Sequence, residues 1–233
     1  MNLDLLLSEL ESLKNLSRVK DFSWFFKTGP GQYGEGDQFL GIMTQPLRKV
    51  TDKYWQDLDF NDVEKLFNNP FHECRNVAVS TLCRQFAKAT PDFQKQIFDF
   101  YLAHTKRINN WDLVDISAPG VVGKYLLNKD RKILYQLAKS DLLWDRRISI
   151  ISTFAFIKNN DFQDTLKISQ LLLNDKEDLM HKAVGWALRE VGKKDLNTLI
   201  KFLDEFTPKL PRTTLRYAIE KFPEEKRLYY LHL

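Results

Sequence analysis

The chain has 233 residues, of which 43% are hydrophobic and 28% are charged, and its formal net charge is +4 at pH 7. This length allows a substantial buried core without disulfides, and the composition excludes a largely disordered or collagen-like chain. The two cysteines, Cys74 and Cys83, are too few for a zinc-finger pattern and favour a reducing compartment.

The N-terminal sequence MNLDLLLSELESLKNL carries acidic residues within its apolar pattern and lacks the basic start of a signal peptide. No apolar run in the chain approaches the roughly 20 residues that span a bilayer. We therefore expect a cytoplasmic protein that does not bind membranes.

Apolar residues recur at helical spacing, with few glycines and prolines between the segments, which predicts helices over 2–15, 18–27 and 46–57. From residue 61 onward the amphipathic segments occur in pairs. The second helices of these pairs are expected to begin 39, 32, 38 and 30 residues apart, at His72, Trp111, Leu143, His181 and Pro211.

A helix pair every 30 to 40 residues is typical of an α-solenoid, in which each pair buries its apolar face against its neighbours. We expect a single all-α repeat domain over 1–233, with less regular N-terminal helices in 1–60 and helix pairs in 61–233. The second helices would then line a concave binding surface. The alternative is a globular helical bundle with chance spacing.

Two segments match the residue pattern of a functional site but lack the neighbouring elements or ligands that such a site requires. Residues 29–34, GPGQYG, match the dinucleotide fingerprint, but a helical segment precedes them where that fold requires a strand. We expect a glycine-rich loop over 29–36 that caps the solenoid or contacts a ligand. His72, Glu73 and Cys74 have no second cluster at metal-ligand spacing, so we expect no metal site.

The segment from His181 to Gly192 is amphipathic, with one unusual face. Rotation by 100° per residue places Lys182, Trp186 and Arg189 opposite the apolar arc, and Gly185 lies beside the tryptophan. A glycine inside a helix is unfavourable unless something approaches the backbone closely. The apolar arc, which we expect to be buried, contains Met180, Ala183, Val184, Ala187, Leu188 and Val191.

The same rotation over 109–117 places Leu113 and Ile116 on one side and Trp111 with Asp115 on the other. Ser117 and Pro119 resemble the N-cap and first position of a following helix. A tryptophan outside the core stripe beside a carboxylate indicates a functional face. The alternative is that the tryptophans fill contacts between repeats and Asp115 is merely solvated.

In the helix beginning at Leu143, Trp144 shares an apolar stripe with Ile148, Ile151 and Ala155, so we expect it in the core. Arg147 lies within the apolar arc and Arg146 points away from it. A guanidinium cannot lose its charge, so Arg147 must be paired, extended to solvent or bound to an anion. A salt bridge between repeats is the alternative.

Exposed aromatic and cationic side chains suit a nucleic-acid partner better than a peptide, because cations contact phosphates and aromatic rings pack on sugars or bases. A carboxylate that faces a polyanion is electrostatically unfavourable. Asp115 therefore suggests that positive charge develops beside it.

Four strings resemble the AlkD-like DNA alkylation repair enzymes, and the resemblance extends over essentially the whole chain. The four strings are FKTGPGQYGEGDQFLGIM (26–43), NNWDLVDISAPGVVGKYL (109–126), LLWDRRISIIS (142–152) and HKAVGWALREVGK (181–193). The family pattern W-D-x-V-D matches Trp111 and Asp115, W-x-x-R matches Arg147, and K-A-x-G-W matches Trp186. Arg146, which adjoins Arg147, makes that correspondence the least certain. The resemblance implies HEAT-like repeats with a concave DNA-binding face.

The activity that this resemblance implies is removal of N-alkylated purines, such as 3-methyladenine and 7-methylguanine, from duplex DNA in base excision repair. Asp115 would stabilise the oxocarbenium-like sugar and orient water, Trp111 and Trp186 would pack around the damaged nucleotide, and Arg147 would hold a phosphate. The cations expected to contact DNA elsewhere are Lys182, Arg189 and Arg146. The family is understood to work from the DNA backbone without a base pocket, a mode that would leave room for bulky adducts; the sequence does not decide whether they are substrates.

We expect a monofunctional glycosylase rather than a lyase, because a phosphate contact explains Lys182 better than a Schiff base does. We also expect that it needs no cofactor, is a monomer and is associated with the nucleoid. Two other hypotheses remain. A non-catalytic binder of distorted or branched DNA needs the cations but not Asp115. A protein-interaction solenoid would use the tryptophans to hold a peptide.

Overall fold

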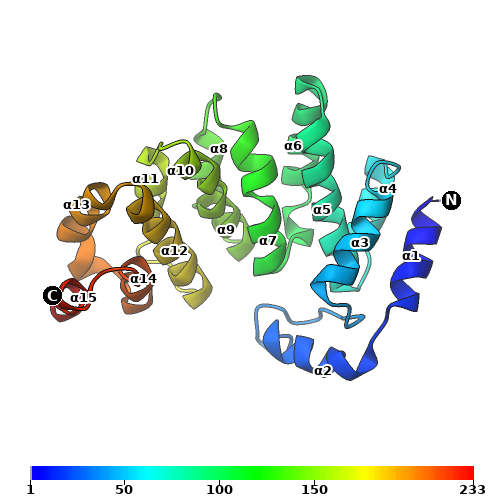
Figure 1. The fold of residues 1–233 in the computed structure, drawn as a ribbon, viewed down its shortest axis with the longest axis horizontal. Coiled ribbons are helices and arrows are strands. Elements are labelled where there is room, and N and C mark those ends of the chain that lie inside the picture. Colours follow the sequence, from blue (N-terminus) through cyan, green and yellow to red (C-terminus); the bar gives the residue numbers. More distant parts are fainter. Residues whose placement is uncertain (1) are drawn as a thin grey trace. The chain divides into compact units, whose positions relative to one another are not determined.

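The computed structural model describes residues 2–233, and Met1 lies outside them. Helices dominate, as predicted, and these residues contain no β-strand beyond an isolated bridge between Gln38 and Phe71 (Figure 1). They divide into two compact units, one ending at Ser117 and the other running from Ala118 to Leu233. A single domain over 1–233 stays a prediction. Within 2–233, each helix is too short or too polar to cross a bilayer.

In the first unit, α5 packs against α3, α4, α6 and α7, while α1 packs on α3. Local signals set several helix starts. The Asp59 carboxylate accepts the Asp62 N–H ahead of α4, and Pro91 occupies the first turn of α6. The helices of this unit are α1 (Asn2–Ser12), α2 (Leu16–Phe25), α3 (Thr44–Tyr54), α4 (Phe60–Phe67), α5 (His72–Lys88), α6 (Pro91–Ala103) and α7 (Trp111–Ser117), with a 3₁₀ turn at Thr105–Arg107.

In the second unit, α12 is central and packs against α9, α10, α11, α13 and α14. Its 17 residues make it the longest helix there. The elements of this unit are a π-helical turn (Pro119–Gly123), α8 (Lys132–Leu137), α9 (Leu143–Ser152), α10 (Phe154–Lys158), α11 (Gln163–Leu171), α12 (Asp178–Lys194), α13 (Leu196–Phe206), a 3₁₀ turn (Thr207–Lys209), α14 (Arg212–Ala218) and α15 (Glu224–His232).

The predicted second helices begin where the sequence placed them, within three residues. Helices α5, α7 and α9 start at His72, Trp111 and Leu143, whereas α12 starts at Asp178 and α14 at Arg212. Second helices also pack on one another within each unit, α5 on α7 in the first and α12 on both α9 and α14 in the second. This nearest-neighbour stacking is the arrangement of a helical-repeat fold rather than of a bundle with chance spacing. Helix α15 lies beyond the predicted elements.

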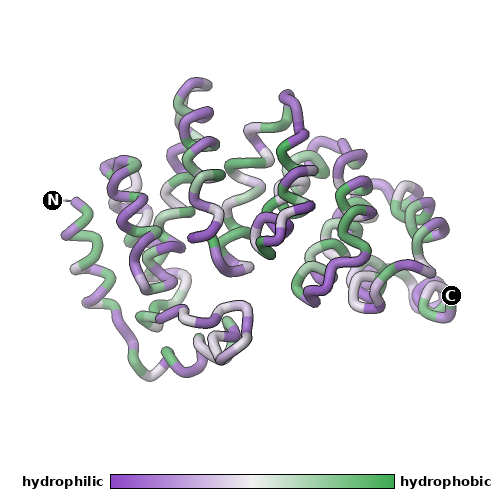
Figure 2. The backbone as a smooth tube through the Cα atoms, turned by 180° about the vertical axis from the view of Figure 1, so that it is seen from behind, coloured by the Kyte–Doolittle hydropathy of each residue, from purple (hydrophilic) through white to green (hydrophobic). Residues whose placement is uncertain are grey.

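The helices alternate between apolar and polar segments along their length (Figure 2). The apolar arc predicted for α12 is buried throughout, from Met180 to Val191. Trp144 is also buried, with Ile148 and Ile151 of α9, as predicted, and the fourth residue of that stripe, Ala155, is buried in α10. Burial of these stripes supplies most of the driving force for packing the helices.

At Gly185 the backbone of α12 lies very close to α14. A Cβ atom there would lie 2.5 Å from Tyr217 Cβ and 2.6 Å from the Thr214 carbonyl oxygen. The glycine that is unfavourable within the helix is therefore explained by the neighbouring helix α14, and a ligand is not needed to explain it.

We expect Gly185→Ala to destabilise the protein by about 1–3 kcal/mol, because overpacking against α14 outweighs the roughly 1 kcal/mol gain in helix propensity. The midpoint of urea unfolding measures this change. Lys201→Ala, at an exposed position of α13, should leave the midpoint almost unchanged. An unchanged or higher midpoint for Gly185→Ala would contradict the close packing.

Candidate functional site

Helix α7 presents Trp111 and Asp115 on its outer side. Its buried face consists of Leu113, Val114 and Ser117. At 100° per residue, Asp115 lies about 150° and Trp111 about 110° from the centre of that face, so the two are about 40° apart. Both residues are half-buried. This is the outward placement that the sequence predicts for them.

Two other predictions for this segment are wrong. Ile116 is 47% exposed and does not share the buried side with Leu113, because burial of Val114 and Ser117 turns the core face away from it. Pro119 does begin the next helical turn, but Ser117 does not cap it. The buried Ser117 hydroxyl donates instead to the Leu113 carbonyl at 2.5 Å and lies 2.8 Å from the Tyr101 hydroxyl.

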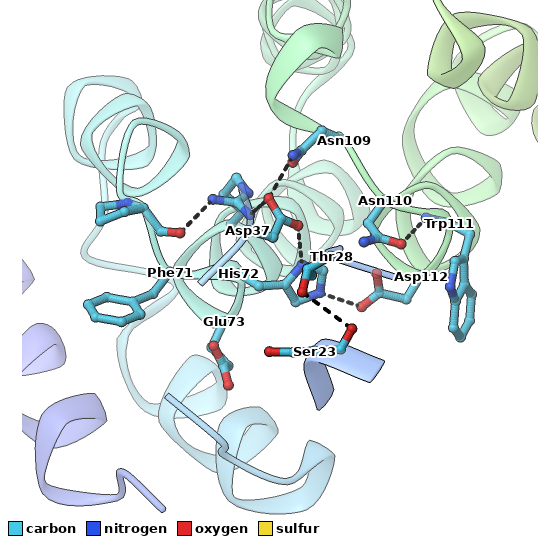
Figure 3. A network of polar contacts seen from close by, with 12 residues as sticks. Ser23, Thr28, Asp37, Phe71, His72, Glu73, Asn109, Asn110, Trp111 and Asp112 are labelled. Carbon is cyan, nitrogen blue, oxygen red and sulfur yellow. Dashed lines mark hydrogen bonds and ion pairs between the residues drawn. The ribbon is translucent and has the colours of Figure 1, made fainter. Parts of the chain in front are cut away.

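The first turn of α7 is held by polar contacts at its N-terminus. The Asn110 side-chain oxygen accepts the Trp111 N–H at 2.9 Å. The Asp112 carboxylate lies 2.9 Å from His72 Nε2, which belongs to α5 (Figure 3). The residue that follows Trp111 is thus tied directly to the neighbouring helix.

Asp37 lies at the centre of this arrangement. Its carboxylate accepts hydrogen bonds from Arg75 at 2.6 Å and Asn109 at 2.9 Å, and its second oxygen is 3.4 Å from His72 Nδ1. Figure 3 shows the His72 ring between the two carboxylates, one from the loop after α2 and one from α7. We call these five residues, Asp37, His72, Arg75, Asn109 and Asp112, the His72 network.

The electrostatics of the His72 network favour a charged imidazole. Burial alone lowers the pKa of His72, but Asp112 and Asp37 outweigh this effect and raise the pKa to about 9. Burial alone would raise the pKa of Asp37, yet its bonds with His72, Arg75 and Asn109 keep that pKa below its ordinary value. At neutral pH an imidazolium therefore bridges two carboxylates.

Glu73, the next residue along α5, holds the loop that carries Asp37. Its buried carboxylate accepts the backbone N–H groups of Leu40, Gly41 and Ile42 at 3.0, 2.8 and 3.2 Å. His72 and Glu73 thus face different partners. Across residues 2–233 there is no group of three or more histidine, cysteine or acidic side chains arranged to hold a metal ion.

An aromatic cluster of Phe25, Phe26 and Phe39 supports Trp111. Phe26 stacks on Trp111 with ring centroids 5.6 Å apart, and Phe25 meets it edge-on at the same distance. On its other contacts Phe26 lies 4.8 Å from the His72 ring and stacks on Phe39 at 5.2 Å. The cluster therefore links Trp111 to the His72 network.

The glycine-rich segment 29–36 is a loop of turns, as predicted, and leads into the segment that contains Asp37. Gly31 and Gly36 have positive φ angles, 73° and 85°. At Gly34 a Cβ atom would lie 2.4 Å from the Phe26 carbonyl oxygen. The glycines thus allow a tight return of the chain against the end of α2.

In the second unit, the two adjacent arginines of α9 differ. Arg147 is 5% exposed and donates to the Leu179 carbonyl at 2.9 Å. Arg146 makes a double contact with Asp175, at 2.6 and 3.3 Å, and also donates to the carbonyls of Ser140 and Asp141. These bonds account for Arg146 as a residue that holds the loop before α9 to the loop before α12.

The polar face of α12 carries the remaining predicted residues. Trp186 is half-buried, meets Phe154 edge-on at 4.6 Å, and donates from Nε1 to Glu190 at 3.1 Å. Lys182 forms an ion pair with Asp178 at 2.7 Å, and Arg189 is hydrogen-bonded to Glu220. A tryptophan between two cations is thus present on this face.

The sequence interpretation missed the His72 network. Its members lie far apart along the chain, with Asp37 and Asn109 separated by 72 residues. The five residues lie within or beside sequence motifs that were noted separately, and only the fold brings them into contact. Chemically, the first unit offers an ionisable carboxylate beside an indole ring on a helix held at both ends, which suits a cationic ligand.

Comparison with known proteins gives a consistent result. A family model described as "DNA alkylation repair enzyme" matches residues 6–222. A solved structure described as "Predicted DNA alkylation repair enzyme from Enterococcus faecalis" superimposes with a TM-score of 0.72 at 15% identity, covering 91% of this chain and 97% of that one. At this identity the second likeness concerns the fold. No curated protein matches the chain.

We expect Glu73→Gln to lower the free energy of unfolding by about 2 kcal/mol, because an amide replaces a buried carboxylate that accepts three N–H groups. Urea unfolding measures the loss. Glu205→Gln makes the same change at an exposed position of α13 and should have almost no effect. Equal midpoints for the two variants would show that the carboxylate does not hold the loop.

Proposed function

This chain belongs to the DNA alkylation repair enzyme family, and we propose that within alkylation repair it is a DNA glycosylase. Its substrates are cationic N-alkylated purines in duplex DNA, of the 3-methyladenine and 7-methylguanine type. The observation that carries this proposal is the outward-facing carboxylate of Asp115, one turn along α7 from Trp111. A helix that only bound DNA would not benefit from an acidic group on that face.

Alkylation at N3 or N7 gives the purine a positive charge. When the bond from C1′ to the base nitrogen breaks, the bonding electrons neutralise that charge, so the base leaves without a general acid. Ordinary glycosidases need two carboxyl groups because their leaving oxygen must be protonated. A single carboxylate is sufficient here.

Asp115 would act on the sugar. As the C1′–N bond lengthens, positive charge develops on C1′ and the ring oxygen, and a nearby carboxylate stabilises it. Water then adds to C1′, and its proton passes to the carboxylate or to solvent. The products are the free alkylated base and an abasic site, which makes the enzyme a monofunctional hydrolase without a cofactor.

Trp111 would pack against the damaged nucleotide and exclude bulk water from Asp115, while its ring face attracts positive charge. In the second unit, we assign Trp186 the same kind of packing against DNA, and Arg147, Lys182 and Arg189 contacts with phosphates. We leave Arg146 out of this set, because Asp175 and two carbonyls engage all three nitrogens of its guanidinium, whereas the hydrogen bond of Arg189 to Glu220 uses one nitrogen.

The decisive experiment is release of free methylated bases from methylated duplex DNA at saturating enzyme. We expect Asp115→Asn to lower the single-turnover rate at least about 100-fold while DNA is still bound, because the lost interaction forms only in the transition state. Asp99→Asn, an exposed carboxylate on α6, should retain the native rate. DNA binding without base release by the native protein would instead support a non-catalytic binder of distorted DNA.

The DNA-binding role of Lys182 is tested by salt dependence. Lys182→Ala should weaken binding at 100 mM salt several-fold and reduce the slope of log K against log salt concentration by about 1. Lys95→Ala is the matched control, since Lys95 also forms an ion pair four residues away, with Asp99, but on the first helix of its pair. Equal slopes for the two variants would contradict a phosphate contact at Lys182.

A further inference from the structure

The buried side chain of His72 has no place in the chemistry above, yet it contacts the helix that carries Asp115. We propose that His72 is a positioning residue for the reaction: held between Asp37 and Asp112, it fixes the first turn of α7 and thereby the places of Trp111 and Asp115. This inference rests on the proposed function and adds a residue to it. Its basis is the geometry of the His72 network.

Helix α7 depends on its neighbours for its position. It has only seven residues, and an isolated helix of that length is not stable in water. At its C-terminal end Ser117 is held by Tyr101, and in its middle Leu113 and Val114 are buried. At its N-terminal end Asp112 makes a polar contact with His72 of α5, and Trp111 packs against Phe25 of α2.

Asp112 depends on His72 for charge compensation. The network's other cation, Arg75, is directed at Asp37 and at the carbonyls of Asn69 and Pro70. Asp112 Oδ1 is buried without a hydrogen-bond partner, so the hydrogen bond that Oδ2 accepts from His72 Nε2 is the one that compensates this carboxylate. Only 17% of the Asp112 side chain is exposed, so loss of this partner would be unfavourable, and α7 would have to shift to hydrate the carboxylate fully.

The protonation state of His72 decides whether both carboxylates are held. An imidazolium donates from both ring nitrogens, whereas a neutral imidazole donates from only one. The charged groups that act on the ring are Asp37 from the loop, Asp112 from α7 and Arg75 from its own helix α5, whereas Glu73 of α5 is directed at the backbone of residues 40–42. Because the pKa of His72 is raised to about 9, the bridge is complete at neutral pH and is lost as pH rises through that value.

The aromatic cluster also connects the position of His72 to that of Trp111. Phe26 contacts both the His72 ring and the Trp111 ring, at centroid distances of 4.8 and 5.6 Å. A shift of His72 or of the first turn of α7 would therefore move Trp111 as well. Displacement of a reacting group by about 1 Å lowers a rate by about 100-fold, which sets the scale of the expected effect.

The test compares two Asp→Asn variants. Asp112→Asn removes the negative charge that pairs with His72, and Asp164→Asn removes one that pairs with Arg131 in the second unit; the two side chains are 17% and 15% exposed. Both should lower thermal stability. Only Asp112→Asn should lower the single-turnover rate of base release, by tenfold or more, with DNA affinity unchanged within about twofold. Equal rates for the two variants would overturn the proposal.

The pH profile of the single-turnover rate separates positioning from stability. The native rate should fall as pH rises through about 9, and in Asp112→Asn the fall should move toward neutral pH, because His72 loses a carboxylate that favours its charged form. Asp164→Asn should keep the native midpoint and so also controls for alkaline loss of the substrate. An identical midpoint in all three proteins would contradict the role of His72.

A readout without substrate keeps this inference separate from the proposed function. The protein is labelled with 5-fluorotryptophan, and the ¹⁹F signal of Trp111 is assigned with Trp111→Phe. In the native protein this signal should shift with a midpoint near pH 9, while that of Trp186 stays constant. A Trp111 signal that does not respond to pH overturns the positioning role, even where bases are released or Asp112→Asn does not fold. If the native protein releases no base, the proposed function fails, and the ¹⁹F titration still decides whether His72 positions Trp111.

Discussion

The first unit depends on the buried imidazolium of His72, which lies between two carboxylates from segments far apart in the chain. Burial of a histidine normally favours its neutral form, and here Asp112 and Asp37 reverse that preference. Through these contacts His72 also holds the loop after α2 and the start of α7 in place against α5. Glu73 strengthens this connection by holding the backbone of residues 40–42.

The second unit is organised differently, around the packing of α12. Close contact at Gly185 brings α14 against its backbone, and α9, α10, α11 and α13 also pack on this helix. Its polar face then carries Trp186, Lys182 and Arg189. The two adjacent arginines of α9 have different partners. Arg146 connects two loops through its hydrogen bonds to Asp175, whereas Arg147 is buried and donates to the carbonyl of Leu179.

The chemistry proposed for Asp115 fits a rigid support better than a flexible one. A cationic purine leaves readily, so little is required of the enzyme beyond a correctly placed negative charge and restricted access of water. The cost of misplacing a single carboxylate is then large, since no second catalytic group compensates for it. A short helix held at both ends by buried polar contacts meets this requirement.

The sequence by itself determined most of the helices, the starts of the second helices, and the outward faces of α7 and α12. These follow from local periodicity and helix-start signals, which also placed Trp111, Asp115 and Trp186 outside the core stripes and predicted the glycine-rich loop and the buried Trp144. It misplaced Ile116 and made Ser117 a cap, because in a seven-residue helix two apolar positions do not define which side is buried. Only the tertiary structure showed that Gly185 allows α14 to pack closely on α12 and that Arg146 is hydrogen-bonded to Asp175. It also showed that His72, Asp37 and Asp112 form one network. Those contacts join residues about 30 to 70 positions apart, and their energies depend on burial and distance, which no local pattern encodes.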